Sequence, residues 1–342
     1  MQLSSSPRAL SWCLVLSLSA CAPVARAPVP RTPPPCAQAS QWPPIDPRVA
    51  TLVAEARLQH RLFGGQTIDP QAHLVQAGFY EAETDRPPGE STPTWRRVLG
   101  FWQSLDPGKP REVRGENGRF TPVAPLLEAL QAQEDSGALD EPQRAALANS
   151  VLRMALVDNP WSAAFISYLE KTAGLDEQEF AFSDAHHVYV EQAFRTAAAE
   201  PSAAGAVAGA YRACDIATTT PRAGDLICHT RGASAGLDGF ESLRSALAAR
   251  RLPPLPGLPM HCDLVVAVDR EHGLLESIGG NVLQSVTLRQ MALDPAPVSA
   301  VSQRYFTRLP EDDAASCIGG SACAPAGNFN RQPWAVLLQW RN

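Results

Sequence analysis

The fold is decided by residues 158–174, which read DNPWSAAFISYLEKTAG. The opening DNP suits the cap and first turn of a helix, and Gly174 suits its C-terminal end. Ser162 then lies in the first turn, where unpaired backbone N–H groups and the helix dipole favour negative charge. The segment therefore predicts a helix with a hydroxyl at its N-terminus, which acts either as a cap or as a nucleophile.

Helical patterns occupy the chain before and just after this segment, and strands follow them. Apolar residues recur at helical spacing in the first part, with turn residues between the runs. The predicted helices cover residues 48–63, 94–105, 125–133 and 141–157, the central segment, and a stretch that begins at 183 or 184. The predicted strands lie within 221–229 and at 261–268, 273–282, 282–288 and 333–340, with one helix inserted at 238–251. This order predicts an α+β fold in which N-terminal helices pack on a small antiparallel sheet.

The N-terminus has the pattern of a secretion signal. Residues 1–21 combine Arg8 with a short apolar run and end in LSAC, which resembles a bacterial lipobox with Cys21 as the lipidated residue. Alanine at position 22 implies, by the same resemblance, an outer-membrane destination with the body facing the periplasm. The alternative is an ordinary signal peptide cut near residue 25 or 27. Acyl chains on Cys21 would anchor the protein to the membrane without a transmembrane helix.

Composition divides the rest of the chain and limits its partners. Residues 22–47 are rich in proline and alanine and predict an extended tether, followed by an N-terminal helical region (48–140) and an α+β domain (141–342) closed by the last strand. The net charge of −6 and the absence of any Lys/Arg run argue against a nucleic-acid partner. We expect no cofactor and no metal, and the absence of any C-x-x-C spacing argues against a zinc site.

Six cysteines remain after the signal region, an even number that favours disulfides in an oxidising compartment. Cys317 and Cys323 flank a short loop and are expected to pair with each other. Cys228 and Cys262 lie in two candidate strands that can be neighbours, so a bridge between them is one option. As free thiols they would instead be substitute nucleophiles, although Cys262 would point away from His261 in a regular strand. The pairing of the remaining cysteines stays open.

A candidate catalytic group can be assembled from three separate segments. His261 begins a strand in which it shares one face with Asp263 and Val265, and Asn281 ends the next strand after two glycines. If that face meets the start of the central helix, His261 reaches the hydroxyl of Ser162 and Asn281 holds the imidazole in one tautomer. The predicted catalytic residues are therefore Ser162 as nucleophile, His261 as base and Asn281 as orienting amide.

Four blocks in this order carry a resemblance. They are WSAAFIS (161–167), GDLI (224–227), HCDLVV (261–266) and IGGN (278–281), and they resemble the CHAP cell-wall amidases and endopeptidases. The body as a whole also resembles a bacterial family known as domain of unknown function 2272. The resemblance implies a papain-like (CHAP-like) fold and peptidoglycan peptides as substrate. Two departures stand out, because CHAP enzymes have a cysteine in place of Ser162 and often a glutamate in place of Gly279.

Further residues near the predicted cleft have two interpretations each. Trp161, His186 and Asp225 are candidates for substrate contact. Each also has a structural explanation: Trp161 would pack in the core, His186 would make an internal hydrogen bond, and Asp225 would cap a turn. Adjacent histidines on a helix point about 100° apart, so His186 and its neighbour at 187 are poorly arranged to bind one metal. The segment GASAG (232–236) fits a nucleophile-elbow pattern, but a flexible loop explains it better.

Three functions are compatible with these patterns. The first is an outer-membrane lipoprotein that cleaves peptidoglycan peptides with serine as nucleophile. The second is a catalytically inactive protein that binds peptidoglycan or scaffolds an envelope complex. The third is an esterase or acyltransferase that uses the same residues. The exchange of cysteine for serine keeps all three open, because a hydroxyl needs a well-placed base whereas a thiol, with a pKa of about 8.5, ionises readily.

Overall fold

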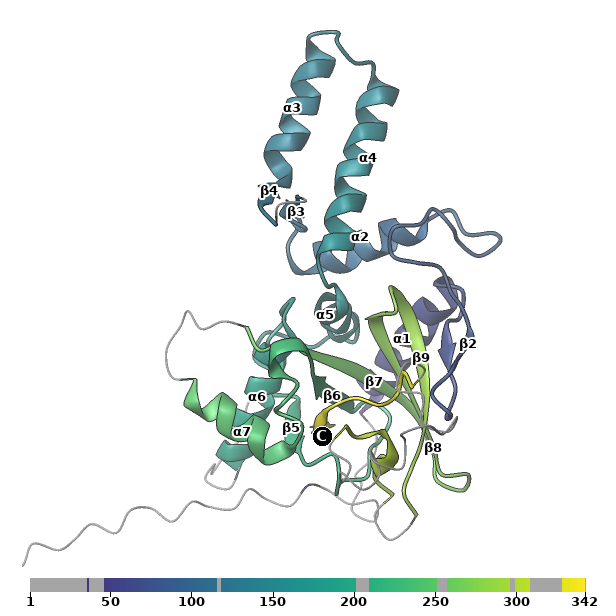
Figure 1. Cartoon of the computed structure of the whole chain (residues 1–342), viewed down its shortest axis with the longest axis vertical. Helices are drawn as coiled ribbons and strands as arrows, with labels where there is room; N and C mark the ends of the chain where they lie inside the picture. Colours follow the sequence, from purple (N-terminus) through teal and green to yellow (C-terminus); the bar gives the residue numbers. More distant parts are fainter. Residues whose placement is uncertain are drawn as a thin grey trace, which may run out of the picture. The chain divides into compact units, whose positions relative to one another are not determined.

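An eight-stranded sheet forms the centre of the protein, with strand order β2-β1-β9-β8-β7-β6-β10-β5 (Figure 1). The computed structural model describes Cys36 and residues 46–115, 118–200, 209–250, 257–295, 299–307 and 328–341. The strands are β1 (Thr67–Ile68), β2 (Leu74–Gln76), β5 (Tyr211–Cys214), β6 (Leu226–Thr230), β7 (Met260–Asp269), β8 (Leu274–Val282), β9 (Ser285–Ala292) and β10 (Trp334–Trp340). A separate pair consists of β3 (Glu112–Arg114) and β4 (Phe120–Pro122).

The sheet is larger and more mixed than the sequence suggested. All its pairings are antiparallel except that of β1 with β9, which is parallel. Strands β1 and β2 come from the region predicted to be helical, and they are too short to show a clear alternation. The α+β class is confirmed for the described part of the chain, whereas the expectation of a small, purely antiparallel sheet is wrong.

The helices are close to their predicted ranges. They are α1 (Pro47–Leu62), α2 (Thr94–Leu105), α3 (Val123–Asp135), α4 (Glu141–Asp158), α5 (Ser162–Thr172), α6 (His186–Ala199) and α7 (Phe240–Ala249). Helix α4 begins with the capping box of Asp140 and Gln143, and the N-cap residue of α7 is Gly239. Helix α5 starts at Ser162, with Trp161 as N-cap, two residues later than Pro160 implied.

Both faces of the central strands are buried, which explains their continuous apolar runs. One core contains α5 side chains such as Phe165 together with Cys262 and Leu264 of β7. A second core lies on the other face and contains Val265 of β7 with Trp334 of β10. Alternate residues of β7 therefore serve two different cores, which decides where its polar side chains can point.

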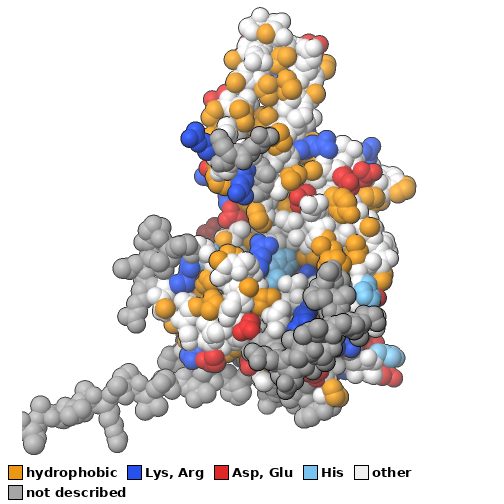
Figure 2. Space-filling view, viewed as in Figure 1, with side chains coloured by type: hydrophobic (Ala, Val, Ile, Leu, Met, Phe, Trp, Pro, Cys, Tyr) orange, Lys and Arg blue, Asp and Glu red, His pale blue; other side chains and the backbone are white. Residues whose placement is uncertain are grey.

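Helices α3 and α4 form an antiparallel hairpin that contacts α2 and β3 (Figure 1). Hydrophobic side chains remain exposed on this hairpin, including Leu147 at 44 % and Met154 at 54 % (Figure 2). The hairpin and strand β3 share a small core of Val113, Val123 and Ala155. The hairpin is therefore held by far fewer buried apolar contacts than the sheet.

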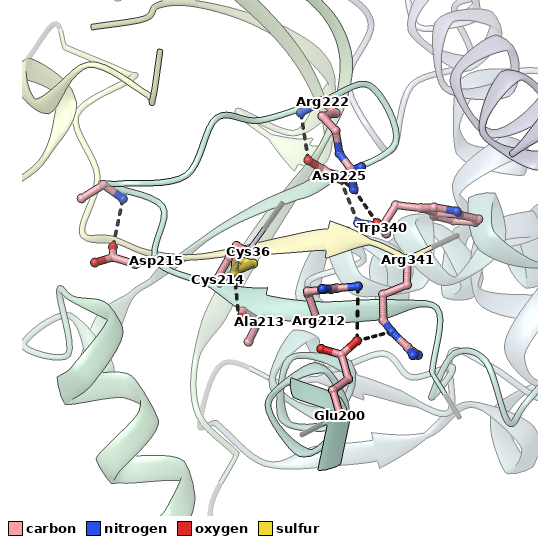
Figure 3. The surroundings of a disulfide bond; sticks show 11 residues. Cys36, Glu200, Arg212, Ala213, Cys214, Asp215, Arg222, Asp225, Trp340 and Arg341 are labelled. Atoms are coloured by element: carbon pink, nitrogen blue, oxygen red, sulfur yellow. Dashed lines mark hydrogen bonds and ion pairs between the residues drawn. A yellow bond between two sulfur atoms is a disulfide. The ribbon is translucent and has the colours of Figure 1, made fainter. Parts of the chain in front are cut away.

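Two disulfides link parts of the described chain. Cys228 and Cys262 are register partners on β6 and β7 and form one bridge, as the neighbouring-strand argument allowed. Cys36 pairs with Cys214 of β5 and so ties the start of the body to an edge of the sheet (Figure 3).

Several predictions fall outside the described residues. They concern the signal peptide (1–21), the lipidation site Cys21, most of the tether (22–47), and the expected Cys317–Cys323 bridge. Within the part of the chain that the structure describes, no helix is long and apolar enough to cross a membrane.

Candidate functional site

Ser162 is the first residue of α5, and its hydroxyl is engaged by an imidazole. The Oγ atom lies 2.7 Å from Nε2 of His186, the first residue of α6. The other ring nitrogen, Nδ1, shares a hydrogen bond with the hydroxyl of Tyr189, one turn further along α6. Ser162 is only 1 % exposed, and His186 and Tyr189 are also buried. Serine, histidine and tyrosine therefore form a continuous hydrogen-bonded row at the start of two helices.

Burial lowers the pKa of His186 well below its usual range, and the nearby His261 and Arg231 lower it further. The imidazole is consequently neutral at pH 7, as a proton acceptor must be. Burial also raises the pKa of Tyr189 well above its usual range, so the phenol keeps its proton. A charged His186 would have no anionic partner in this row, which makes it a weak base.

His261 on β7 has a different partner. Its Nε2 atom lies 2.7 Å from Oδ1 of Asp263, and Nε of Arg289 lies 2.9 Å from the other carboxylate oxygen. Burial by itself would raise the pKa of Asp263, but His261 and Arg289 together hold it below its usual range. Burial lowers the pKa of His261 although Asp263 opposes this shift. A neutral His261 therefore donates its Nε2 proton to an ionised Asp263, which leaves Nδ1 unprotonated.

The face of β7 that carries His261 is not the face on which α5 packs. Cys262 and Leu264 contact the core of α5, whereas Val265 on the His261 side belongs to the second core. A Cβ added at Gly280 would meet Phe165 of α5, while one at Gly279 would meet Asp263. The expected direct contact between His261 and Ser162 is therefore replaced by one between His186 and Ser162. His261 lies next in the row, since the two imidazole rings are 5.2 Å apart.

Gly279 leaves room for the carboxylate of Asp263. A Cβ at this position would lie 1.8 Å from Oδ1 of Asp263 and 2.9 Å from Nε2 of His261. The Asp263 carboxylate thus fills the space that a side chain at 279 would occupy. The carboxylate that contacts the His261 ring therefore belongs to Asp263 on the same strand and not to a residue of the neighbouring strand.

Asn281 does not orient His261. In the amide orientation that satisfies both of its groups, its nitrogen donates to Glu81 at 3.1 Å and its oxygen accepts from the Trp161 backbone at 3.2 Å. Burial raises the pKa of Glu81 to about 7, although the indole N–H of Trp161, which Glu81 accepts, lowers it. Asn281 has a φ of 55°, a left-handed conformation that asparagine tolerates better than most residues. Asn281 therefore holds the backbone at the start of α5, and Asp263 is the residue that orients the His261 ring.

Trp161 and Asp225 have structural roles in place of the expected substrate contact. Trp161 is fully buried among aromatic rings that include Phe101 and Phe165. The Asp225 carboxylate accepts from the backbone N–H groups of Arg222 and Trp340, both at 2.8 Å (Figure 3). It is fully buried and joins the turn before β6 to the end of β10. The capping interpretation of Asp225 and the packing interpretation of Trp161 match these contacts.

The rings of His186, His261 and His229 follow one another, and we call them the histidine row. Two cavities lie beside this row. The larger, about 390 Å³, is lined by His186 and by apolar residues such as Trp102 and Met260. The smaller, about 160 Å³, is lined by polar residues that include His229, His261 and Asn281. Arg231 lines both. Histidine surface is visible close to Lys or Arg surface in Figure 2. The structure thus brings His261 and Asn281 to one cavity and His186 to the other.

The remaining candidates do not form a second site. Residues Gly232–Ser234 of the GASAG segment form a short 3₁₀ helix after β6 and not a strand-to-helix elbow. Cys228 and Cys262 are joined in a disulfide and offer no thiol. No group of three or more metal-ligating side chains occurs within the residues that the structure describes.

Sequence reasoning missed five residues of this region, namely Asp263, Tyr189, His229, Glu81 and Arg231. Asp263 could have been found, since it lies two residues after His261 and shares its face by the strand period. Tyr189 lies three residues after His186, the spacing of neighbours on a helix. Glu81 and Arg231 carry no local signal, because tertiary contacts alone bring them to the site.

The fold and site together define an α+β protein in which a buried serine at a helix N-terminus contacts a histidine row. The chain belongs to the family described as an uncharacterized protein conserved in bacteria (DUF2272), whose model matches residues 90–340. No curated protein and no solved structure matches the chain. The matched region contains all the histidines of the row and excludes Glu81.

Proposed function

We propose that this protein is an envelope lipoprotein whose body hydrolyses amide bonds in peptidoglycan stem peptides, with Ser162 as the nucleophile. The observation that carries the proposal is the hydrogen bond of 2.7 Å between Oγ of Ser162 and Nε2 of His186 at the N-terminus of α5. The resemblance of four sequence blocks to the CHAP amidases and endopeptidases supports the substrate class, although the histidine that contacts Ser162 lies on helix α6 and not on a strand. Lipidation at Cys21 would hold the body at the outer membrane, facing its polymer.

The contacts of Ser162, His186 and Tyr189 assign each of these residues a role in the proposed hydrolysis. In the tautomer with a proton on Nδ1, His186 donates to Tyr189 and its Nε2 accepts the proton of Ser162. The Ser162 oxygen then forms a bond to the substrate carbonyl carbon, and the backbone N–H groups at the start of α5 favour the resulting oxyanion. The proton passes to the leaving amine as the C–N bond breaks, and water releases the acyl group by the same path in reverse.

His261 and Asp263 supply what His186 lacks. An ionised carboxylate 2.7 Å from His261 stabilises a protonated imidazole, whereas His186 has only neutral or cationic neighbours. Both nitrogens of His186 are engaged by Ser162 and Tyr189, so His261 and Asp263 act on a charge at His186 through space, across rings that are 5.2 Å apart. We therefore assign proton acceptance to His186 and its stabilisation in the row to His261 with Asp263.

Replacement of Ser162 by alanine tests the proposal in the purified full chain. Muropeptide release from purified sacculi should fall by at least about 1,000-fold, since loss of a nucleophile removes the covalent step. Labelling with a fluorophosphonate should disappear in the same variant. Glu170→Gln is the matched control, because Glu170 is equally buried on α5 but lies away from both cavities. Equal release by the wild type and the Ser162→Ala variant would remove Ser162 from the chemistry.

A second function, binding without turnover, is favoured by one observation. Ser162 is 1 % exposed and lines neither cavity, so a substrate carbonyl reaches it only if the site opens. This alternative predicts that the protein sediments with purified sacculi, releases no muropeptides at any protein concentration, and is not labelled by a fluorophosphonate.

A further inference from the structure

Arg231 follows β6 and is the one residue that lines both cavities. Its backbone is fixed, because its N–H donates to the Pro259 carbonyl at 3.0 Å and its own carbonyl accepts from Ser234 at 3.0 Å. The side chain is half-buried. A cation held at the junction of two cavities is in a position to meet a ligand in either of them.

Within the described part of the chain, nothing neutralises the positive charge of Arg231. Among the residues that the structure describes, no carboxylate pairs with its guanidinium. Asp184, which lines the same larger cavity, is paired with Lys109. Asp263, near the smaller cavity, is paired with Arg289 and His261. The surrounding groups are imidazoles, which stay neutral because burial and the neighbouring cations keep the pKa values of His186, His229 and His261 low.

We propose that Arg231 is a carboxylate-binding residue that anchors the substrate between the two cavities. This inference rests on the proposed function for the identity of the ligand, a short peptide with a free carboxylate near the amide to be cleaved. The larger cavity, with Trp102 and Met260, takes the apolar side of the peptide, and the smaller cavity takes the polar side. A guanidinium binds a carboxylate through two parallel hydrogen bonds, which also fix the orientation of the ligand.

The test compares two forms of one peptide on the full-length protein by calorimetry. The probes are a peptidoglycan stem tetrapeptide with free carboxyl groups and the same peptide with every carboxyl group amidated. The wild type should bind the free acid at least tenfold more tightly. Arg231→Gln should abolish this preference by weakening the free acid tenfold or more while leaving the amidated form within about twofold, since a charge-assisted hydrogen bond is lost. Arg231→Lys should retain part of the preference.

Arg244→Gln is the matched control, because it removes an equal charge from an exposed residue of α7 that pairs with Glu241. It should leave both affinities unchanged. Equal binding of both peptides by the wild type, which needs no variant to fold, would overturn the carboxylate site. A preference that persists in a folded Arg231→Gln variant would do the same. The preference for the free acid does not depend on turnover, so a protein that prefers the free acid but releases no muropeptides supports the anchor and contradicts the hydrolase.

Discussion

The two ends of α5 both bury polar side chains, yet only one end has the features of a site. At the N-terminal end, Ser162 contacts His186, and the histidine row reaches two cavities. Further along the helix, Glu170 is fully buried and accepts from the Tyr211 hydroxyl at 2.7 Å. Burial raises the pKa of Glu170 to about 8, although Tyr211 opposes this shift, so the carboxyl group is neutral at pH 7.

The difference between the ends lies in charge and access. The Glu170 end carries a protonated acid against a phenol and lines neither cavity. The Ser162 end carries neutral imidazoles, an ionised Asp263 and the cation Arg231 beside open volume. A perturbed pKa therefore identifies buried groups at both ends, and only cavity access and unneutralised charge separate a candidate site from a structural contact.

The largest effect is expected when the space beside Asp263 is filled. Gly279→Ala would place a Cβ 1.8 Å from the Asp263 carboxylate and 2.9 Å from Nε2 of His261, and both of these side chains are buried. Breaking a buried charge pair and overpacking the strand should together lower the free energy of unfolding by about 3 kcal/mol or more. Denaturant unfolding measures this loss. Gly236→Ala meets nothing within 4 Å and should cost less than about 0.5 kcal/mol. Similar values for the two variants would contradict the close packing at Gly279.

A smaller effect is expected when Asp263 loses its charge but keeps its shape. Asp263→Asn should lower muropeptide release by about 100-fold, equivalent to about 2.7 kcal/mol, because the negative charge that stabilises a protonated imidazole in the row is lost. Glu170→Gln at the other end of α5 should change release by less than about twofold. A folded Asp263→Asn variant with wild-type release would show that His261 takes no part in proton transfer.

The smallest effect is a pair of opposite pH dependences of stability. Glu170 has a folded pKa above its unfolded value of 4.5, so it weakens the folded state as pH rises from about 5 to 8. His186 has a folded pKa below 6.5, so it weakens the folded state as pH falls below 6.5. Each slope is at most about 1.4 kcal/mol per pH unit.

Unfolding measured across this pH range separates the two ends. Between about pH 6.5 and 8 Glu170→Gln alone should flatten the stability profile, and below about pH 4.5 His186→Gln alone should do so, whereas between these limits the two groups act in opposite directions. Glu81, whose pKa is raised to about 7, remains in both variants and contributes equally to each. If either variant flattened the profile in the other variant's range, the protonation state assigned to that end of α5 would be wrong.

Local patterns predicted much of the fold. Helix α2 has its predicted bounds, and α1, α3, α4 and the strands β7, β8 and β10 lie within about two residues of theirs, because apolar periodicity and turn residues specify them. Strands β1 and β5 gave no such signal. Each is short, and its place in the sheet depends on partners far away in the sequence.

The site was predicted in its parts and not in its connections. The sequence identified Ser162 at a helix start, His261 on a strand, and His186 near the cleft. It could not say which face of β7 turns toward α5, since a two-residue period defines the faces without assigning either to a partner. In the structure His186 contacts Ser162, and His261 contacts Asp263. Asn281 instead contacts Glu81 and the backbone at the start of α5.

The sequence by itself determined the helices, the central strands, the helix that carries Ser162 and the residue types of the site. Only the tertiary structure decided which imidazole meets the hydroxyl and which cation lies at the junction of the two cavities. The physical reason is that secondary structure depends on residues a few positions apart in the sequence. The contacts of the polar side chains depend instead on how two cores pack on opposite faces of one sheet, which involves residues far apart in the sequence.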